Sequence, residues 1–347
     1  MGRPPVVRRL DVRINGRLAG EYRYNPAGGV SFAYDADWLG WEFAFPISRQ
    51  LPLMGGSQSG AHVNAVFENL LPDNTDLRRR IAERTEARSD RPHDLLAAIG
   101  RDCIGAMQFL PRGGDPGDPF RIEGAPQSEA EIAATIRDLA TSPLGMRADD
   151  TFRISLAGAQ EKTAFLWHDG AWLKPAGLTP TTHIFKRRMG VVSHGIDMTD
   201  SVENEWLCLK LAAAMGLPVN DARIATFEDQ TVLVVTRFDR APREKGGILR
   251  LPQEDFLQAL GFESGQKYQE HGGPSMQDGL RLLEGSRERV ADQLLFLKAH
   301  IVNWVLAAID GHAKNYSLFL GPGGFAMTPL YDILSAAPAM GTGAFRH

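Results

Sequence analysis

The stretch from residue 301 to residue 336 constrains this chain more than any other. It begins in an apolar run, passes through the sequence DGHAKN and continues into a second apolar run. The sequence GPGG at 321–324 then predicts a tight turn, because glycine and proline favour the backbone angles of turns. We therefore expect a helix, a loop and a short β-hairpin, with Asp310, Asn315 and Asp332 placed around the hairpin.

Two carboxylates and one amide in this order are typical of phosphoryl transfer. Asp310 and Asn315 are five residues apart, which is the spacing between the base and the metal-binding amide of a kinase catalytic loop. Asp332 follows one hairpin later, where such a site needs a second Mg²⁺ ligand. The same residues also fit an ordinary loop, since Asp-Gly pairs form turns and Asn and Asp cap local backbone. The spacing alone leaves both interpretations open.

Length and composition narrow the class of protein. The 347 residues suffice for two domains, or for one domain with a large appendage. A net charge of −4 gives no support for direct DNA binding. Neither Cys103 nor Cys208 has a second Cys or His at the spacing of a metal site, which favours a reduced intracellular setting. The most apolar window, residues 294–309, is interrupted by Lys298, and the N-terminus is not typical of a signal peptide. We expect a cytoplasmic protein without a membrane segment.

The first third of the chain predicts strands followed by helices. Residues 6–34 have strand patterns, and Asn15-Gly16 between them is a strong hairpin signal. From His62 onward, apolar residues recur at spacings of three and four, which predicts helices. The Gly-, Pro- and Asp-rich residues 111–119 are typical of a linker. We therefore place an N-terminal subdomain at 1–113 and a second, larger core at 114–347.

Helix signals recur in the second part. Ser128 with Glu131, and Asp200 with Glu203, each have the spacing of a capping box at a helix N-terminus. Further predicted elements are a buried strand at 231–238, a helix at 253–260, a polar and mobile loop at 267–274, and a long helix at 287–308.

Two local patterns suggest phosphate binding. Small residues at 157–159 allow backbone N–H groups to approach phosphate oxygens, although a tight connection before a hairpin explains them equally well. Lys186 ends an apolar strand, where an ammonium group needs a partner. A nucleotide phosphate, Glu203 or Glu205 would serve as that partner.

Together these motifs resemble one family, the HipA-like serine/threonine kinases, which are toxins of bacterial toxin–antitoxin pairs. The resemblance covers nearly the whole chain in the same order. In the N-terminal half it rests on FENLLPDN at 67–74 and IGRDCIGA at 99–106. In the second part it rests on SLAGAQEK at 155–162, THIFK at 182–186, TRFDR at 236–240, RLPQED at 250–255, DGHAKN at 310–315 and PLYDILS at 329–335.

The resemblance implies an α/β (α+β) fold with two lobes, an α/β N-terminal part and a mostly helical C-terminal part. It implies ATP and Mg²⁺ as cofactors, Asp310 as catalytic base, and Asn315 with Asp332 as Mg²⁺ ligands. Ser155 matches the serine that the family autophosphorylates, which displaces the phosphate loop and inactivates the kinase. The ATP-binding residues implied are Ala157, Gly158, Ala159, Gln160, Glu161, Lys162, Lys186, Thr236, Arg237, Phe238, His312, Lys314 and Tyr331.

The resemblance also implies partners. The expected substrate is an aminoacyl-tRNA synthetase, whose phosphorylation inhibits translation. The expected partner is a small helix-turn-helix antitoxin, HipB-like, through which the chain reaches DNA indirectly. Family members continue with further helices after the motif around Asp332, whereas this chain stops at His347, as a short member or a fragment would.

Two functions from other classes use some of the same residues. A small-molecule kinase shares the Asp–Asn–Asp set, but the Ser155 motif and the N-terminal half argue against it. A non-catalytic co-repressor that only binds its antitoxin has no need of Lys186, Asp310, Asn315 and Asp332.

Overall fold

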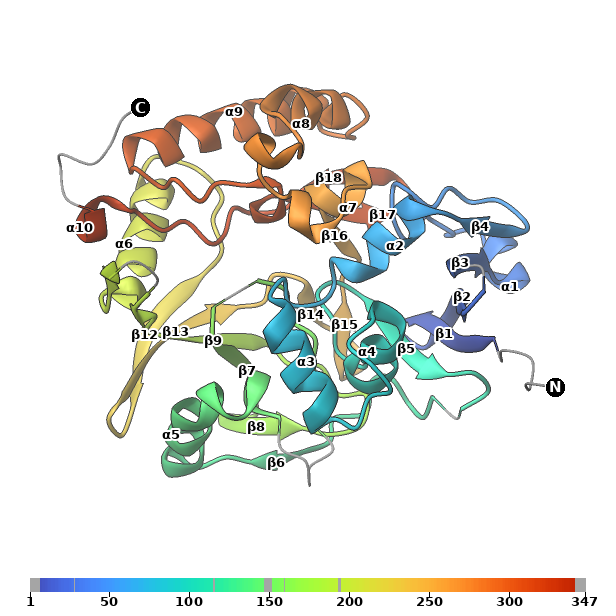
Figure 1. The fold of residues 1–347 in the computed structure, drawn as a ribbon, viewed down its shortest axis with the longest axis horizontal. Coiled ribbons are helices and arrows are strands. Elements are labelled where there is room, and N and C mark those ends of the chain that lie inside the picture. Colours follow the sequence, from blue (N-terminus) through green and yellow to red (C-terminus); the bar gives the residue numbers. More distant parts are fainter. Residues whose placement is uncertain are drawn as a thin grey trace.

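The computed structural model describes residues 7–27, 29–114, 116–146, 152–158, 160–192 and 195–340. Within these residues, helices and strands are mixed along the whole chain (Figure 1). The expected α/β (α+β) class therefore holds. A mostly helical C-terminal part is not confirmed, because runs of apolar and β-branched residues such as 231–235 form strands there.

The N-terminal part is an antiparallel five-stranded sheet with short helices packed against it. The strand order is β4-β3-β2-β1-β5. Asn15 and Gly16 join β1 to β2 with φ of 49° and 85°, the positive angles that a tight hairpin turn needs. The strands are β1 (Arg8–Ile14), β2 (Arg17–Asn25), β3 (Gly29–Tyr34), β4 (Ser57–Ser59) and β5 (Met107–Pro111). The helices are α1 (Ala36–Leu39), α2 (Ala61–Glu68), α3 (Thr75–Arg84) and α4 (Pro92–Ile99).

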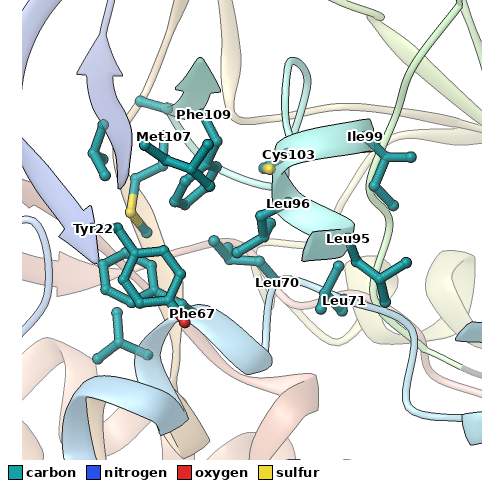
Figure 2. Packing of buried hydrophobic residues seen from close by; sticks show 14 of the residues in the cluster. Tyr22, Phe67, Leu70, Leu71, Leu95, Leu96, Ile99, Cys103, Met107 and Phe109 are labelled. Carbon is teal, nitrogen blue, oxygen red and sulfur yellow. The ribbon is translucent and has the colours of Figure 1, made fainter. Parts of the chain in front are cut away.

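Aromatic and aliphatic residues together fill the core between this sheet and α2 and α4 (Figure 2). The ring centroids of Tyr22 and Phe67 are 4.1 Å apart, and those of Phe67 and Phe109 are 5.7 Å apart. The same core continues through Phe152 to Leu156. The segment that leads into the predicted phosphate loop therefore packs against the N-terminal part.

A six-stranded antiparallel sheet follows, in the order β12-β13-β9-β7-β8-β6. Residues alternate along β13: Val232 and Val234 pack with α5 on one face, and Leu233 and Val235 pack with α6 on the other. Its strands are β6 (Gly124–Pro126), β7 (Lys162–His168), β8 (Ala171–Pro175), β9 (His183–Arg187), β12 (Ala222–Phe227) and β13 (Gln230–Thr236). The helices are α5 (Glu129–Arg137) and α6 (Ser201–Ala214), and the small pair β10 (Gly190–Val191) and β11 (Asp197–Met198) precedes α6.

The last part combines a three-stranded sheet, in the order β16-β17-β18, with helices. The predicted hairpin of the catalytic stretch is β17 (Ser317–Gly321) and β18 (Gly324–Met327). The remaining elements are β14 (Arg240–Pro242), β15 (Ile248–Arg250), β16 (Gln253–Asp255), α7 (Phe256–Leu260), α8 (Met276–Leu283), α9 (Arg289–Val305) and α10 (Ala337–Met340). The 3₁₀ turns are η1 (Asp138–Ala140), η2 (Pro143–Gly145), η4 (Ser264–Gln266), η5 (Gln269–His271) and η6 (Ala313–Asn315).

Several local predictions can be compared directly with these elements. The capping box at Ser128 and Glu131 is confirmed. The one at Asp200 is wrong, because Glu203 binds Arg188 at 2.8 Å and the Asp200 side chain makes no capping bond to the described backbone. The helix expected at 253–260 begins only at Phe256, since the preceding residues pair with β17 as β16. Among the described residues, no helix is long and apolar enough to span a membrane.

Candidate active site

A cavity of about 250 Å³ lies where the three parts of the chain meet. It is lined by the residues that follow α2, by the predicted phosphate loop, by the six-stranded sheet and by the catalytic stretch. Of the residues predicted to bind ATP, those on the lining are Ala157, Gly158, Gln160, Lys162, Lys186, Arg237, Phe238, His312, Lys314 and Tyr331. The catalytic candidate Asp310 and the metal-binding candidate Asp332 line it as well.

Two of the described residues that were predicted to bind ATP stand apart from this group. Glu161 and Thr236 lie outside the lining of the cavity. Thr236 pairs with His183 in the sheet, and Glu161 forms an ion pair of 3.2 Å with Arg187. Ala159 lies outside the described residues.

A second, much smaller cavity of about 10 Å³ brings Asp310, Asn315 and Asp332 together. Its volume suits one water molecule or one small ion. The Asn315 amide nitrogen donates to the backbone oxygen of Asp332 at 3.3 Å. Its buried Oδ1 has no hydrogen-bond partner in the described part of the chain, which leaves this oxygen available. An amide oxygen and a carboxylate in one small cavity fit a hard cation such as Mg²⁺.

Asp332 has a strained backbone. Its φ of 59° is in the left-handed region, which a residue with a side chain rarely adopts. Such strain is concentrated at functional sites, because the surrounding structure must impose it. Here it accompanies the contact of the Asp332 carboxylate with Lys186 at 2.5 Å.

Lys186 lies buried between two carboxylates. Its Nζ donates to Glu205 at 2.7 Å and to Asp332 at 2.5 Å. Burial lowers the pKa of Lys186, but the two carboxylates outweigh it and raise that pKa above the ordinary value. Burial likewise favours a high pKa for Asp332, yet Lys186 and Lys162 hold it below its ordinary value. Of the two glutamates proposed as partners, Glu205 fills this role.

Lys162 is the second cation of the cavity. Its Nζ donates to the backbone oxygen of Ala157 at 2.8 Å, which holds the loop closed over β7. Burial and the nearby charge of Lys186 lower the pKa of Lys162 to about 8. A Cβ on Gly158 would lie 2.7 Å from this ammonium group, and the φ of Gly158 is 95°. Only glycine fits there without displacing the lysine.

Ser155 is fully buried beneath the loop. Its hydroxyl donates to the backbone oxygen of Leu70 at 2.7 Å, and its N–H donates to the backbone oxygen of Asp102 at 3.0 Å. The serine therefore ties the start of the loop to the N-terminal part.

The N-terminal part also reaches the catalytic loop, which the sequence did not reveal. Lys314 donates to Asp73 at 2.7 Å and to the side chain of Asn69 at 3.1 Å. Burial favours a higher pKa for Asp73, but Lys314 outweighs it and lowers that pKa below the ordinary value. The only signal in the sequence was the motif at 67–74, on which the family resemblance partly rests.

Part of the cavity lining is aromatic. The ring of Phe238 lies 5.7 Å from that of Tyr331 and 5.7 Å from that of Phe319. The Tyr331 hydroxyl donates to the backbone oxygen of Lys314 at 2.8 Å, which fixes the ring beside the catalytic loop. Aromatic side chains and two lysines on the lining of one cavity suit a nucleotide base with its phosphates.

Arg237, which was predicted to bind ATP, has its side chain directed elsewhere. Its guanidinium donates to Asp239 at 2.8 Å and to the Thr181 hydroxyl at 2.9 Å. It belongs to a cluster that we call the buried arginine cluster, and that joins the N-terminal part to the strands around it. The members are Asp102, Arg237, Asp239, Arg240 and Arg250.

Comparisons with known proteins agree with this architecture. Residues 10–110 match the family model of the HipA N-terminal domain, and residues 154–346 match that of the HipA-like C-terminal domain. The serine/threonine-protein kinase toxin HipA of Shewanella oneidensis is 30% identical over 347 residues, which cover 94% of this chain and 75% of that protein. A Sinorhizobium fredii protein named as a kinase is 34% identical over 334 residues, which cover 95% of this chain and 78% of that protein.

A solved structure is similar over the same extent. A chain from the complex of Shewanella oneidensis HipA, HipB and operator DNA superposes with a TM-score of 0.78 at 28% identity. The superposition covers 94% of this chain and 76% of that one. The fold and these relatives define a kinase of the toxin–antitoxin class. The chain belongs to the family of HipA-like kinases.

Proposed function

We propose that this chain is an ATP- and Mg²⁺-dependent serine/threonine protein kinase and the toxin of a type II toxin–antitoxin pair. The observation that carries the proposal is the small cavity shared by Asp310, Asn315 and Asp332 at the edge of a larger cavity with two lysines. The aromatic wall formed by Phe238 and Tyr331 accommodates the base of ATP, and Lys162 and Lys186 hold its phosphates.

Each residue has a separate task in this proposal. The Asp310 carboxylate accepts the proton of the serine or threonine hydroxyl while the hydroxyl oxygen forms its bond to the γ-phosphorus and ADP leaves. Asn315 and Asp332 hold Mg²⁺, which offsets phosphate charge when it is bound. Glu205 holds Lys186 at the cavity, and the ammonium group of Lys186 binds the phosphates.

The test is a comparison of Asp310→Asn with the wild type. We expect phosphate transfer from ATP to fall by about 10²–10⁴-fold, since general-base catalysis is lost. ATP affinity should change by less than about twofold, because the carboxylate orients the hydroxyl and is not the main nucleotide ligand. Transfer is measured with radiolabelled ATP and affinity by calorimetry. A loss of affinity as large as the loss of rate would show that Asp310 has another role.

The substrate and partners follow from the family. We propose an aminoacyl-tRNA synthetase as the substrate, and a HipB-like helix-turn-helix antitoxin as the partner that links the chain to DNA in the cytoplasm. The solved relative in complex with HipB and operator DNA supports the second point. Phosphoproteomics after a brief induction in cells tests the substrate, and co-purification with the antitoxin encoded beside the gene tests the partner. A phosphorylated protein of another class would overturn the synthetase assignment.

We also propose a division into residues 1–113 and 114–347. The two family matches, 10–110 and 154–346, fall on either side of this boundary. Arg112 is exposed there and offers a site for trypsin. Cleavage at this position should leave two fragments that stay associated, because the core around Phe67 continues into Phe152 and Leu156. If trypsin cleaves the chain at another position before it cleaves after Arg112, the boundary between residues 113 and 114 is wrong.

A further inference from the structure

The polar segment at residues 263–274, between α7 and α8, crosses the catalytic loop; we call it the strap. Its Tyr268 hydroxyl donates a hydrogen bond to Oδ1 of Asp310. The Asp310 side chain is 64% exposed, and within the described residues its carboxylate accepts no other hydrogen bond. The tyrosine is therefore the group that orients the predicted base.

The strap, which includes the loop expected at 267–274, contacts the chain on two sides. Lys267 forms an ion pair of 3.6 Å with Asp73 of the N-terminal part. The backbone oxygen of Lys267 accepts from the N–H of Ala313 in the catalytic loop at 3.4 Å. The Tyr268 ring packs edge-on against His312, with ring centroids 5.0 Å apart. The phenol is thus held by contacts that do not involve Asp310.

Two glycines make this path possible. Gly272 has a φ of 82°, which favours glycine, and a Cβ on Gly273 would lie 1.8 Å from the backbone oxygen of Gln266. The N–H of Gly273 donates to the backbone oxygen of Tyr268 at 3.0 Å, which closes the strap on itself. The sequence therefore builds a fixed turn that presents one tyrosine to Asp310.

We propose that Tyr268 is a positioning residue for phosphoryl transfer. Its hydroxyl holds Oδ1 of Asp310 and leaves Oδ2 directed toward the cavity, where it accepts the proton of the substrate hydroxyl. Tyr268 keeps its own proton throughout. An exposed carboxylate without this bond would sample several orientations, and a base displaced by about 1 Å can cost up to about 10²-fold in rate. The inference rests on the proposed function, because it assigns Asp310 as the base.

The first test is Tyr268→Phe, which removes the hydroxyl and keeps the ring against His312. With Mg²⁺, ATP and dephosphorylated casein as acceptor, we expect kcat to fall roughly tenfold while the KM for ATP stays within about twofold. Tyr24→Phe is the matched control: it removes a tyrosine hydroxyl that contacts Arg91, far from the site, and should leave kcat unchanged. An unchanged kcat in Tyr268→Phe would refute the proposal. A raised kcat would also refute it, and would show that the tyrosine blocks the base.

A double-mutant cycle separates positioning from a general structural effect. In the Asp310→Asn background, Tyr268→Phe should reduce the residual rate no further, because the tyrosine acts only through Asp310. An equal reduction in both backgrounds would mean that the strap is merely structural, and would overturn the proposal.

A structural measurement remains decisive even if the wild type transfers no phosphate to casein. Crystal structures of wild type and Tyr268→Phe are compared with Mg²⁺ and a non-hydrolysable ATP analogue bound. We expect one Asp310 rotamer in the wild type and more than one in the variant. One identical rotamer in both would refute the role of Tyr268. Failure of the proposed function itself would instead appear as measurable transfer at equal rates in wild type and Asp310→Asn.

Discussion

Replacing Asp102 with asparagine tests how the two parts of this kinase are held together. The Asp102 side chain is only 5% exposed. It accepts hydrogen bonds from the N–H and hydroxyl of Thr181 at 3.0 and 2.8 Å, and from Arg240 at 2.9 Å. Arg250 and Arg237 approach it at 3.3 and 3.4 Å. One carboxylate from the N-terminal part thus meets three guanidinium groups of the core.

The cost of the substitution follows from these contacts. Asparagine keeps the shape, but it presents an NH₂ donor to groups that are all donors, and it leaves three buried arginines with Asp239 as the remaining carboxylate of the cluster. Removing one partner of a buried ion pair costs about 3–5 kcal/mol. Since a domain's total stability is roughly 5–15 kcal/mol, we expect Asp102→Asn to shift the urea unfolding midpoint strongly. Asp76→Asn is the control, because Asp76 is 77% exposed and should change stability by less than about 0.5 kcal/mol.

The pH dependence of stability distinguishes the loss of the Asp102 charge from a change in packing. Burial alone would raise the pKa of Asp102, but the guanidinium groups of Arg240, Arg237 and Arg250 outweigh it and hold that pKa well below the ordinary 3.8. A depressed folded-state pKa contributes stability that is fully present above the ordinary pKa and is lost as the pH falls toward the folded value. The difference in the free energy of unfolding between wild type and Asp102→Asn should therefore be constant from about pH 5 to about pH 9. This difference should become smaller below about pH 4. Two results would refute this reasoning. One is a loss of unfolding free energy under about 1 kcal/mol in Asp102→Asn, and the other is a difference between the two proteins that does not become smaller in acid.

Two further predictions concern the cavity. Asp332→Ala removes a metal carboxylate and the partner of Lys186, so the Mg²⁺ concentration needed for ATP binding should rise at least about tenfold in a titration. An unchanged Mg²⁺ concentration would show that the metal binds at another site. Because burial lowers the pKa of Lys162 to about 8 and bound phosphates favour its charged form, ATP binding should take up a proton and weaken as the pH rises through that value. Calorimetry in buffers of different ionisation enthalpy measures this uptake, which should vanish in Lys162→Gln; uptake that persists in the variant would exclude Lys162 as its source.

Local signals in the sequence predicted local structure well. Asn15-Gly16 forms the expected turn, and Ser128 caps its helix, because each depends on neighbours within a few residues. Asp310, Asn315 and Asp332 are close in the sequence, before and after the β17–β18 hairpin, and all three line one small cavity. The contact of Asp73 with Lys314 spans 241 positions, and no local pattern encodes it.

Where two local signals competed, tertiary contacts decided. Residues 253–255 continue a helical pattern, yet they pair with β17, and Asp255 then caps α7 through Gln258. Asp255 stands three positions before Gln258, which is the spacing of a capping box and indicates that the helix begins at Phe256. Arg237 follows a buried strand as a nucleotide contact might, but its charge is neutralised by Asp239, two residues away, and by Asp102. The sequence did not show that this arginine faces the core.

Ser155 connects the structure to the regulation that the family resemblance implies. The serine is 0% exposed, and its neighbours Ile154 and Leu156 belong to the same core as the N-terminal sheet. A phosphoryl group adds a charge of about −1.5 to −2, which cannot remain among these apolar side chains. Phosphorylation therefore requires the loop to leave its position, and it prevents the loop from returning. The bond from Lys162 to Ala157 would then be lost together with the phosphate-binding surface of the loop.

This reasoning predicts different outcomes for two substitutions at Ser155. Ser155→Ala loses one hydrogen bond to Leu70, a cost of about 1 kcal/mol, and should keep phosphate transfer to casein while losing self-inactivation. Ser155→Asp places a carboxylate in the same core and should bind ATP poorly, because the loop cannot close. Intact-mass spectrometry of the wild type after incubation with ATP and Mg²⁺ should show one added phosphate, located at Ser155 by peptide mapping, with activity falling as it accumulates. If the wild type gains no phosphate, or gains it elsewhere while Ser155→Ala is still inactivated, Ser155 serves only to anchor the loop to the N-terminal part.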